Sequence, residues 1–233
     1  MKRDEFPEEV DRIFGVGTGR YYDEIVEFTT AGLDSQWKRQ ILERVGSPRR
    51  VLDLACGTGI LTFGLKDRSP DSQVVGVDLN EEYLVEARKR LADRGDEGVT
   101  FLCSGAETVP LDGTFDRIMT SYLPKYVDLR RLLDHLRPYL EPGSRLVLHD
   151  FVQPRDRRMA RFLRWRFIRL REWAARERPE AIGMFETLPE VIRQSDWDRR
   201  LPPLLEELGF VDVERTYLDN EQAAIVTAAL PAG

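Results

Sequence analysis

The sequence predicts an α/β domain in which helices cover a mostly parallel sheet, and three observations lead to this prediction. Between residues 51 and 149, short apolar runs alternate with segments of helical periodicity. A turn with two glycines, Gly57 and Gly59, directly follows the first apolar run. Two strand-like runs separated by a short polar turn stand near the end of the chain. Alternating strands and helices form parallel sheets with right-handed crossovers, and a terminal β-hairpin makes such a sheet mixed.

The elements follow in order along 233 residues, which we predict to form a single domain, 1–233. Residues 1–46 have apolar positions at helical spacing and are expected to form an N-terminal helical cap, which Gly46-Ser47-Pro48 ends. A second helical stretch, 151–200, is expected as an insertion after the fifth strand. Seven strands are predicted, at 51–55, 73–78, 99–103, 115–121, 145–149, 211–218 and 223–229, with helices through residue 65 and over 81–94 and 129–140.

The composition argues against several classes of protein. Apolar residues make up 42% of the chain and charged residues 33%, as in globular domains, and no run reaches the roughly 20 apolar residues of a membrane-spanning helix. The two cysteines and two histidines stand at no metal-ligand spacing, so no metal is expected. The N-terminal sequence MKRDEFPEEVDR lacks the apolar core of a secretory signal, which favours a cytoplasmic location. A net charge of −6 argues against nucleic acid as a partner.

The glycine turn has the pattern of a nucleoside-binding site. The segment VLDLACGTG runs from a buried strand into a tight turn at Gly57, Thr58 and Gly59, after which a helix begins. Glycines at such a turn let the backbone bend sharply and approach a ligand closely. Asp78 ends the next strand, 19 residues after Gly59, and a carboxylate there can accept both hydroxyl groups of an adenosine ribose. The combination predicts a Rossmann-like nucleoside site.

Two residues distinguish among the nucleoside cofactors. A dinucleotide fingerprint has a third glycine three residues after the second, and this chain has Thr62 there. Asp53 lies in the strand just before the loop, where its carboxylate would repel a pyrophosphate. The same carboxylate suits a cofactor with a cationic amino group and no phosphate. S-adenosylmethionine (SAM) has these properties, so the sequence predicts SAM as the cofactor.

At these residues the chain resembles the class I SAM-dependent methyltransferases, and within them the branch of the ubiquinone and menaquinone C-methyltransferases. The resemblance spans roughly residues 20–230 and includes the glycine loop, Val75-Gly76-Val77-Asp78, Leu136 to Gly143 and Leu208-Gly209-Phe210. It implies an enzyme that methylates carbon or oxygen of a small acceptor, lipophilic or aromatic and similar to a quinone precursor. A homodimer is compatible with the sequence.

Carried over position by position, the resemblance implies a set of cofactor-binding residues. Asp53, Gly57, Thr58 and Gly59 would surround the methionine part of SAM, and Asp78 would bind the ribose. The rest of the implied site consists of Leu79 beside the adenine, Gly105 and Ala106 at the adenine edge, Ser121 under the sulfonium, and Tyr22 closing over the cofactor from the N-terminal helices.

The chain departs from the family pattern at several positions. Asp34-Ser35 stands where the quinone enzymes have a His-Arg pair, and Pro124-Lys125-Tyr126 where they have an Arg-Asn pair. Gly105 replaces an acidic or amide residue, so the adenine amino group loses a side-chain partner. Two alternatives therefore stay open beside the quinone-like acceptor. One is an N- or O-methyltransferase of a polar metabolite, and the other is a SAM-binding regulatory subunit without transfer activity.

Methyl transfer demands few particular side chains, because the carbon is already activated and the protein mainly orients the acceptor and removes a proton. Candidate catalytic residues near the sulfonium are Tyr122, Lys125, His149 and Asp150. His149 ends the fifth strand, at the edge of the sheet where ligands gather, and a neutral imidazole can accept a proton from a phenol or enol. A structural histidine is the competing interpretation. Aromatic acceptors are favoured if Tyr122, His149 and Trp173 line one cavity.

The segment from Arg155 to Arg178 contains ten arginines and only three acidic residues. On a helical wheel its apolar residues, Phe162 among them, form one arc, while Trp165 and Ile168 fall among the arginines. Three interpretations stay open. The segment is a lid helix over the acceptor site with solvated or paired arginines, a surface that contacts anionic membrane, or a dimer contact or site for an acidic substrate.

Overall fold

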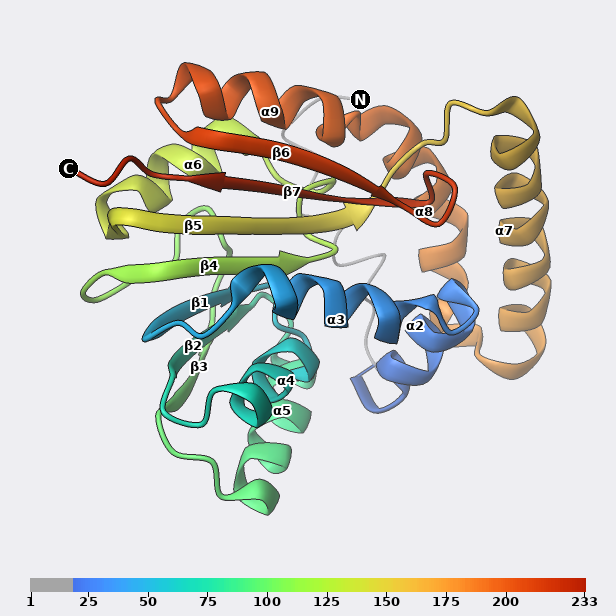
Figure 1. Ribbon diagram of the computed structural model, residues 1–233. Coiled ribbons are helices and arrows are strands. Elements are labelled where there is room, and N and C mark those ends of the chain that lie inside the picture. The colour runs from blue at the N-terminus through green and yellow to red at the C-terminus, as the bar shows by residue number, and fades with distance from the viewer. Residues whose placement is uncertain (1–18) are drawn as a thin grey trace.

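The computed structural model describes residues 19–233, and its strands form one seven-stranded sheet (Figure 1). The strands are β1 (Arg50–Leu54), β2 (Gln73–Asp78), β3 (Val99–Cys103), β4 (Phe115–Ser121), β5 (Leu140–Phe151), β6 (Val211–Leu218) and β7 (Ala223–Ala229). Their order is β3-β2-β1-β4-β5-β7-β6. β1 to β5 are parallel, and β7 is antiparallel to both β5 and β6. The predicted mixed sheet with a C-terminal hairpin is confirmed.

Helices cover both faces of this sheet. They are α2 (Tyr22–Thr30), α3 (Leu33–Val45), α4 (Ile60–Arg68), α5 (Glu81–Arg94), α6 (Leu129–Leu136), α7 (Arg157–Glu177), α8 (Ile182–Ser195) and α9 (Trp197–Glu207), with short 3₁₀ turns η2 (Gly19–Tyr21), η3 (Arg137–Tyr139) and η4 (Pro179–Ala181). On one face, Trp37 and Ile41 of α3 pack against Met119 and Val147 of the central strands. On the other face, α6 and α9 bury their leucines against the same strands.

The strands are rich in apolar residues because helices pack on both faces of the sheet. All residues of β7 except Thr227 are buried, since the strand lies between β5 and β6 with helices over it. Burying one Ile or Val side chain contributes about 1.5–3 kcal/mol, so Ile225 and Val226 hold the terminal hairpin firmly on the sheet. The carboxyl ends of β1, β2, β4 and β5 consequently have fixed positions at one edge.

Helical segments gather at this carboxyl edge. Of the predicted cap, 1–46, residues 1–18 lie outside the described residues, and the remainder forms η2, α2 and α3. In the predicted insertion, 151–200, α7 and α8 pack against each other at the end of the sheet (Figure 1), whereas α9 packs on β6 and β7 as part of the sheet's own cover. Within residues 19–233, no helix has the length and apolar character needed to span a membrane.

The fifth strand differs from its predicted bounds. The helix expected over 129–140 ends at Leu136 and continues only as a 3₁₀ turn through Pro138, whose missing N–H cannot extend an α-helix. β5 then begins at Leu140 rather than at Arg145. Its register with β4 shifts between Phe115 and Arg117, so the Pro142-Gly143 segment is accommodated as an irregularity within the strand instead of a loop before it.

Candidate functional site

The glycine turn after β1 is tied to the end of β2. Gly57 and Gly59 have φ of +56° and +86°, in the left-handed region that glycine adopts without a steric penalty. The two Asp78 carboxylate oxygens accept hydrogen bonds from the backbone N–H groups of Gly57 and Asn80, both at 2.8 Å. Burial raises the pKa of Asp78, and these backbone bonds counteract the rise. A carboxylate has about four acceptor positions, so further hydroxyl groups can still bind.

Asp53 presents a buried carboxylate with spare capacity. Its side chain is fully buried, and one oxygen accepts a hydrogen bond from the Thr62 hydroxyl at 2.6 Å. Within residues 19–233 the other oxygen has no hydrogen-bond partner. Burial raises the pKa of Asp53 to about 7, with the Thr62 bond acting against the rise. A cationic donor at the free oxygen would satisfy it and lower this pKa, because an opposite charge favours the carboxylate.

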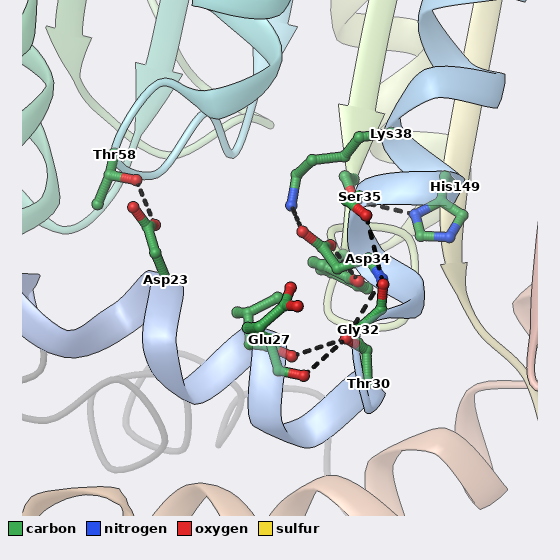
Figure 2. Close-up of polar contacts among 12 residues, drawn as sticks. Asp23, Glu27, Thr30, Gly32, Asp34, Ser35, Lys38, Thr58 and His149 are labelled. Carbon is green, nitrogen blue, oxygen red and sulfur yellow. Dashed lines mark hydrogen bonds and ion pairs between the residues drawn. The ribbon is translucent and has the colours of Figure 1, made fainter.

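The N-terminal helix α2 closes over the glycine turn. The Thr58 hydroxyl donates to Asp23 of α2 at 2.6 Å, as Figure 2 shows, and Arg90 of α5 forms an ion pair with the same carboxylate. Tyr22 is next to Asp23, and its ring contacts the Tyr83 ring in a tilted arrangement, with 4.5 Å between the centroids. A Cβ atom at Gly57 would lie 3.6 Å from the Tyr22 ring. Tyr22 therefore lies against the turn, and its closing over the cofactor stays a prediction.

The loops after β2 and β3 meet on the other side of Asp78. The backbone N–H of Ser104 donates to the Asp78 carbonyl at 2.9 Å, so Gly105 and Ala106 are positioned beside the end of β2. Leu79 follows Asp78 and is 51% exposed, an unusual exposure for a leucine next to a buried strand. A planar apolar group can cover Leu79 between these two loops. A Cβ at Gly105 would meet only the Thr108 hydroxyl, at 3.5 Å.

At the ends of β4 and β5, Ser121 and His149 are partners in the sheet register. The Ser121 hydroxyl and His149 Nδ1 are 2.9 Å apart. His149 is fully buried beneath the Trp37 ring, and within the described chain its Nε2 has no partner. Burial, with the nearby Lys38 and Lys125 ammonium groups, holds the pKa of His149 well below its usual range. This environment favours the neutral imidazole and makes it a weak base, and its role in catalysis stays a prediction.

Tyr122 follows β4 with a φ of +69°, a backbone conformation that a bulky residue rarely adopts. Its backbone N–H donates to the His149 carbonyl at 2.9 Å, and its hydroxyl donates to Asp34 at 2.7 Å. Lys38 forms an ion pair with the same Asp34, as Figure 2 shows. Burial and the Asp34 charge raise the pKa of Tyr122 well above its usual range. The phenol is therefore a hydrogen-bond donor and not a base at neutral pH.

A buried ion pair lies beside Tyr122. Lys125 Nζ is 2.7 Å from Asp150 Oδ1 and 2.9 Å from the Tyr122 carbonyl, and its side chain is only 2% exposed. The ammonium also lies over the Tyr126 ring, 4.2 Å from the centroid. Burial lowers the pKa of Lys125 despite the Asp150 charge. Within residues 19–233, this is the ion pair with the lowest exposure of both side chains.

Two cavities adjoin these residues. The smaller, of about 30 Å³, is lined by aromatic, aliphatic and threonine side chains around Lys125: Tyr22, Val26, Thr29, Thr30, Tyr122, Tyr126, Phe151, Met184 and Leu188. The larger, of about 620 Å³, lies between α7 and α8 and shares Thr29, Thr30 and Phe151 with the smaller one. His149 and Trp173 line neither of these two cavities, so the grouping of Tyr122, His149 and Trp173 posed by the sequence analysis does not form.

Arg90 is a residue of the site that the sequence analysis missed, together with the roles of Asp23 and Lys38. Arg90 is one of several arginines on α5, and no local pattern marks it because its partners are more than 30 positions away. The Asp34–Lys38 pair has the i,i+4 spacing of a helical ion pair, which was a usable signal. The hydrogen bond between Asp34 and Tyr122 had no such signal, because it joins residues 88 positions apart.

Comparisons with known proteins agree with this geometry. The model of the ubiE/COQ5 methyltransferase family matches residues 3–229. A demethylmenaquinone methyltransferase of Thermus thermophilus is 31% identical over 193 residues, which are 81% of this chain and 87% of that protein. A ubiquinone/menaquinone biosynthesis C-methyltransferase of Marinomonas is 29% identical over 88% of this chain and 83% of its own length.

A solved structure shares the fold. The SAM-dependent methyltransferase of Aquifex aeolicus superimposes with a TM-score of 0.59 over 99% of both chains, at 16% sequence identity. The predicted cofactor fits the residues present here, since Asp53 has a free buried oxygen for a cationic amino group and Asp78 has free acceptor positions at the end of β2. The chain therefore belongs to the ubiE/COQ5 methyltransferase family and is a SAM-dependent methyltransferase.

Proposed function

We propose that this enzyme methylates a ring carbon of a small aromatic acceptor of the quinone-precursor type. The observation that carries the proposal is the buried Lys125 ammonium among the rings of Tyr22, Tyr122 and Tyr126, at the carboxyl edge of the sheet. Ligands bind at this edge in open α/β sheets. The names of the relatives, a demethylmenaquinone methyltransferase and ubiquinone/menaquinone C-methyltransferases, point to the same acceptor class.

We also propose how the cofactor is held. Asp53 would accept a hydrogen bond from the amino group of SAM through its free oxygen, Gly57 to Gly59 would let the methionine part lie against the backbone, and Asp78 would accept the ribose hydroxyls. The exposed Leu79 would pack on the adenine, with Gly105 and Ala106 at its edge. Tyr22 would cover the cofactor, and Ser121 would lie at the sulfonium end. The geometry of each residue described above supports this assignment.

Bound SAM supplies an electrophilic methyl group, so the protein has to make the acceptor carbon nucleophilic. A ring carbon gains nucleophilicity when a neighbouring hydroxyl loses its proton to water, and once this carbon carries the methyl group it releases its own hydrogen to water as a proton. The Lys125 ammonium is placed to stabilise the resulting oxyanion, because a charge interaction is stronger in a site from which water is excluded. Tyr122 and Tyr126 would form the walls that orient the ring. His149, a weak buried base, would act as a positioning residue through Ser121 and the backbone of Tyr122.

The test is methyl transfer from labelled SAM to reduced demethylmenaquinone, with mass spectrometry to locate the new methyl group. We expect a product methylated at carbon, and no product from the Asp78→Ala variant. O-methylation of simple phenols or N-methylation of polar metabolites would instead favour an N- or O-methyltransferase of a polar metabolite. SAM binding without turnover of any acceptor would favour a regulatory subunit.

We propose in addition that α7 contacts an anionic membrane surface, from which a lipophilic acceptor would arrive. Trp165 and Ile168 are 57% and 47% exposed on the outward side of α7, surrounded by arginines. Aromatic and aliphatic residues flanked by arginines are typical of helices that lie in a membrane interface. The measurement is flotation with phosphatidylglycerol vesicles at 50 mM salt. Trp165→Ser/Ile168→Ser should reduce binding, and absence of binding by the natural chain would contradict the proposal.

A further inference from the structure

The larger cavity has an apolar interior of the size of a ligand site. Its volume of about 620 Å³ lies within the range of small-molecule pockets. The interior is formed by one side of α7, the facing side of α8 and the segment after β5. The apolar lining residues are Trp37, Phe151, Val152, Pro154, Ala160, Leu163, Phe167, Leu170, Pro189 and Ile192.

Three arginines that line this cavity have no hydrogen-bond or ion-pair partner among the described residues. Arg157, Arg161 and Arg164 are spaced i, i+4 and i+7 on α7, which places them along one side of the helix. Within residues 19–233 none of their side chains forms a hydrogen bond or an ion pair. The other two lining arginines are different, since Arg166 donates to the Thr29 carbonyl and Arg193 pairs with Glu190.

The acidic residues of the lining do not balance this charge. Glu190 already accepts from Arg193 and Gln194, which leaves Glu186 as the one other carboxylate of the cavity lining. Five arginines therefore face two glutamates around an apolar interior. Guanidinium groups bind carboxylates and phosphates with paired hydrogen bonds, so the arrangement is complementary to a ligand with an apolar body and an anionic group.

The larger cavity adjoins the smaller one beside the proposed acceptor site. Thr29, Thr30 and Phe151 line both cavities, and the smaller one contains Lys125. The smaller cavity, of about 30 Å³, has room for one small group only, so an elongated molecule would extend from the arginines of α7 to Thr29, Thr30 and Phe151, next to Lys125. The chain's departures from the family pattern at Asp34 and Lys125 lie at the same end.

We propose that this cavity binds an anionic amphiphile, whose apolar part lies along Ala160, Leu163 and Phe167 and whose carboxylate or phosphate contacts Arg157, Arg161 and Arg164. The inference rests on the proposed function where it identifies the ligand with the acceptor: the acceptor would then be an aromatic ring with an apolar body and a terminal acidic group. A phospholipid offers the same chemistry, so the two sources have to be separated by experiment.

The test is calorimetric titration of the full-length chain with octyl phosphate, a single-chain ligand used below the concentration at which it forms micelles, in 150 mM salt. Arg161→Gln/Arg164→Gln should weaken binding at least about tenfold, since each lost charge-assisted contact is worth roughly 1 kcal/mol at an exposed position. The matched control is Arg158→Gln/Arg176→Gln, which removes the same charge from α7 away from the cavity and should leave the affinity unchanged. Ala160→Phe, which narrows the interior, should weaken binding as well.

Any of three results would overturn the proposal. Both double variants could bind octyl phosphate equally well, the natural chain could bind octanol as tightly as octyl phosphate, or it could show no saturable binding of octyl phosphate. The titration needs no methyl transfer, so its failure leaves the proposed reaction standing. Phosphatidylglycerol vesicles then identify the source. If Arg161→Gln/Arg164→Gln loses octyl phosphate but still binds vesicles, the cavity serves a soluble or extracted acceptor. If it loses both while Arg158→Gln/Arg176→Gln keeps its vesicle binding, the cavity holds a membrane lipid.

Discussion

The cofactor edge and the acceptor side of this enzyme are built differently. At the cofactor edge, the groups come from short segments, residues 53–59 and 78–80, and backbone N–H groups hold them in place. On the acceptor side, the contacts join distant side chains, such as Tyr122 with Asp34 and Lys125 with Asp150. A local backbone motif specifies a cofactor class in a few residues, whereas an acceptor pocket is specified only when several elements have packed together.

The cofactor edge follows the sequence pattern of the family, whereas the acceptor side departs from it. The glycine loop and Asp78 follow the pattern of the methyltransferases. Asp34 and Lys125 depart from it, and both contact Tyr122, through its hydroxyl and its backbone carbonyl. The departures therefore concern one cluster, which argues for a changed acceptor more than for a lost activity. Variants on each side should then have separable effects.

The largest effect is expected from Lys125→Met. The substitution leaves Asp150 buried without its partner, which costs about 3–5 kcal/mol of folding stability. The double variant Lys125→Met/Asp150→Asn should recover much of this loss, because the amide carries no charge and its oxygen can still accept from the backbone N–H groups that Asp150 binds, those of Lys125 and Phe151. Denaturant unfolding measures both. SAM affinity of the folded protein should change little, and a large loss of SAM affinity in the stable double variant would contradict the separation of the two sides.

Asp78→Ala is the counterpart at the cofactor edge. It removes the acceptor for Gly57 and Asn80 and for the proposed ribose hydroxyls, so SAM affinity should fall about 100-fold, the equivalent of two hydrogen bonds to a charged group. Calorimetry with SAM and S-adenosylhomocysteine measures this. Asp96→Ala removes a half-buried carboxylate beyond α5 that pairs with Arg94; it is the control and should bind SAM normally. Unchanged affinity in Asp78→Ala would remove the ribose assignment.

Asp53 should make SAM binding depend on pH. Its pKa in the free enzyme is about 7, and a cationic amino group at the free oxygen lowers it, so binding releases a proton below pH 7. Affinity should therefore rise with pH, by about tenfold between pH 6 and 8. Asp53→Asn should bind more weakly but without this slope. A slope that survives in Asp53→Asn would assign it to another group.

The fold was predictable because its signals are local. The alternation of apolar runs with helical segments predicted the sheet, and the turn at Asp219-Asn220-Glu221 predicted the hairpin of β6 and β7. The start of β5 was not predictable, since Pro142-Gly143 is typical of a loop and is kept in the strand by its neighbours. The wheel of α7 placed Trp165 and Ile168 outward correctly but Phe162 inward, whereas Phe162 is 47% exposed because α7 buries only a narrow strip.

In the candidate site, too, some features were predictable from local sequence and others depend on tertiary packing. Asp53 and Asp78 could be chosen as candidates from local sequence, since both stand at fixed positions relative to a strand end, and their roles toward the cofactor stay predictions. His149 was expected to end the fifth strand, whereas β5 continues for two more residues to Phe151, and the complete burial of His149 depends on Trp37, more than 100 positions earlier. The left-handed backbone of Tyr122 and its bond to Asp34 likewise follow from tertiary packing and have no local signature.

Gly105→Asp should produce the smallest effect and a gain. Family members have an acidic or amide residue here, and the resemblance places it at the adenine amino group. The backbone allows a side chain, because Gly105 does not have a positive φ and a Cβ meets only the Thr108 hydroxyl at ordinary contact distance. One hydrogen bond at a partly exposed position contributes about 0.5–1.5 kcal/mol, which predicts roughly threefold tighter SAM binding.

Gly113→Asp is no adequate control for this variant, since a side chain there would clash with Arg50. Gly105→Ala is the better one, because it adds the Cβ without the acceptor and should leave SAM affinity unchanged. An equal gain in SAM affinity from Gly105→Ala would mean that backbone stiffening causes the effect. A loss of affinity in both variants would mean that the adenine occupies the space beside Gly105. The cofactor edge, like the acceptor side, would then be adapted in this chain.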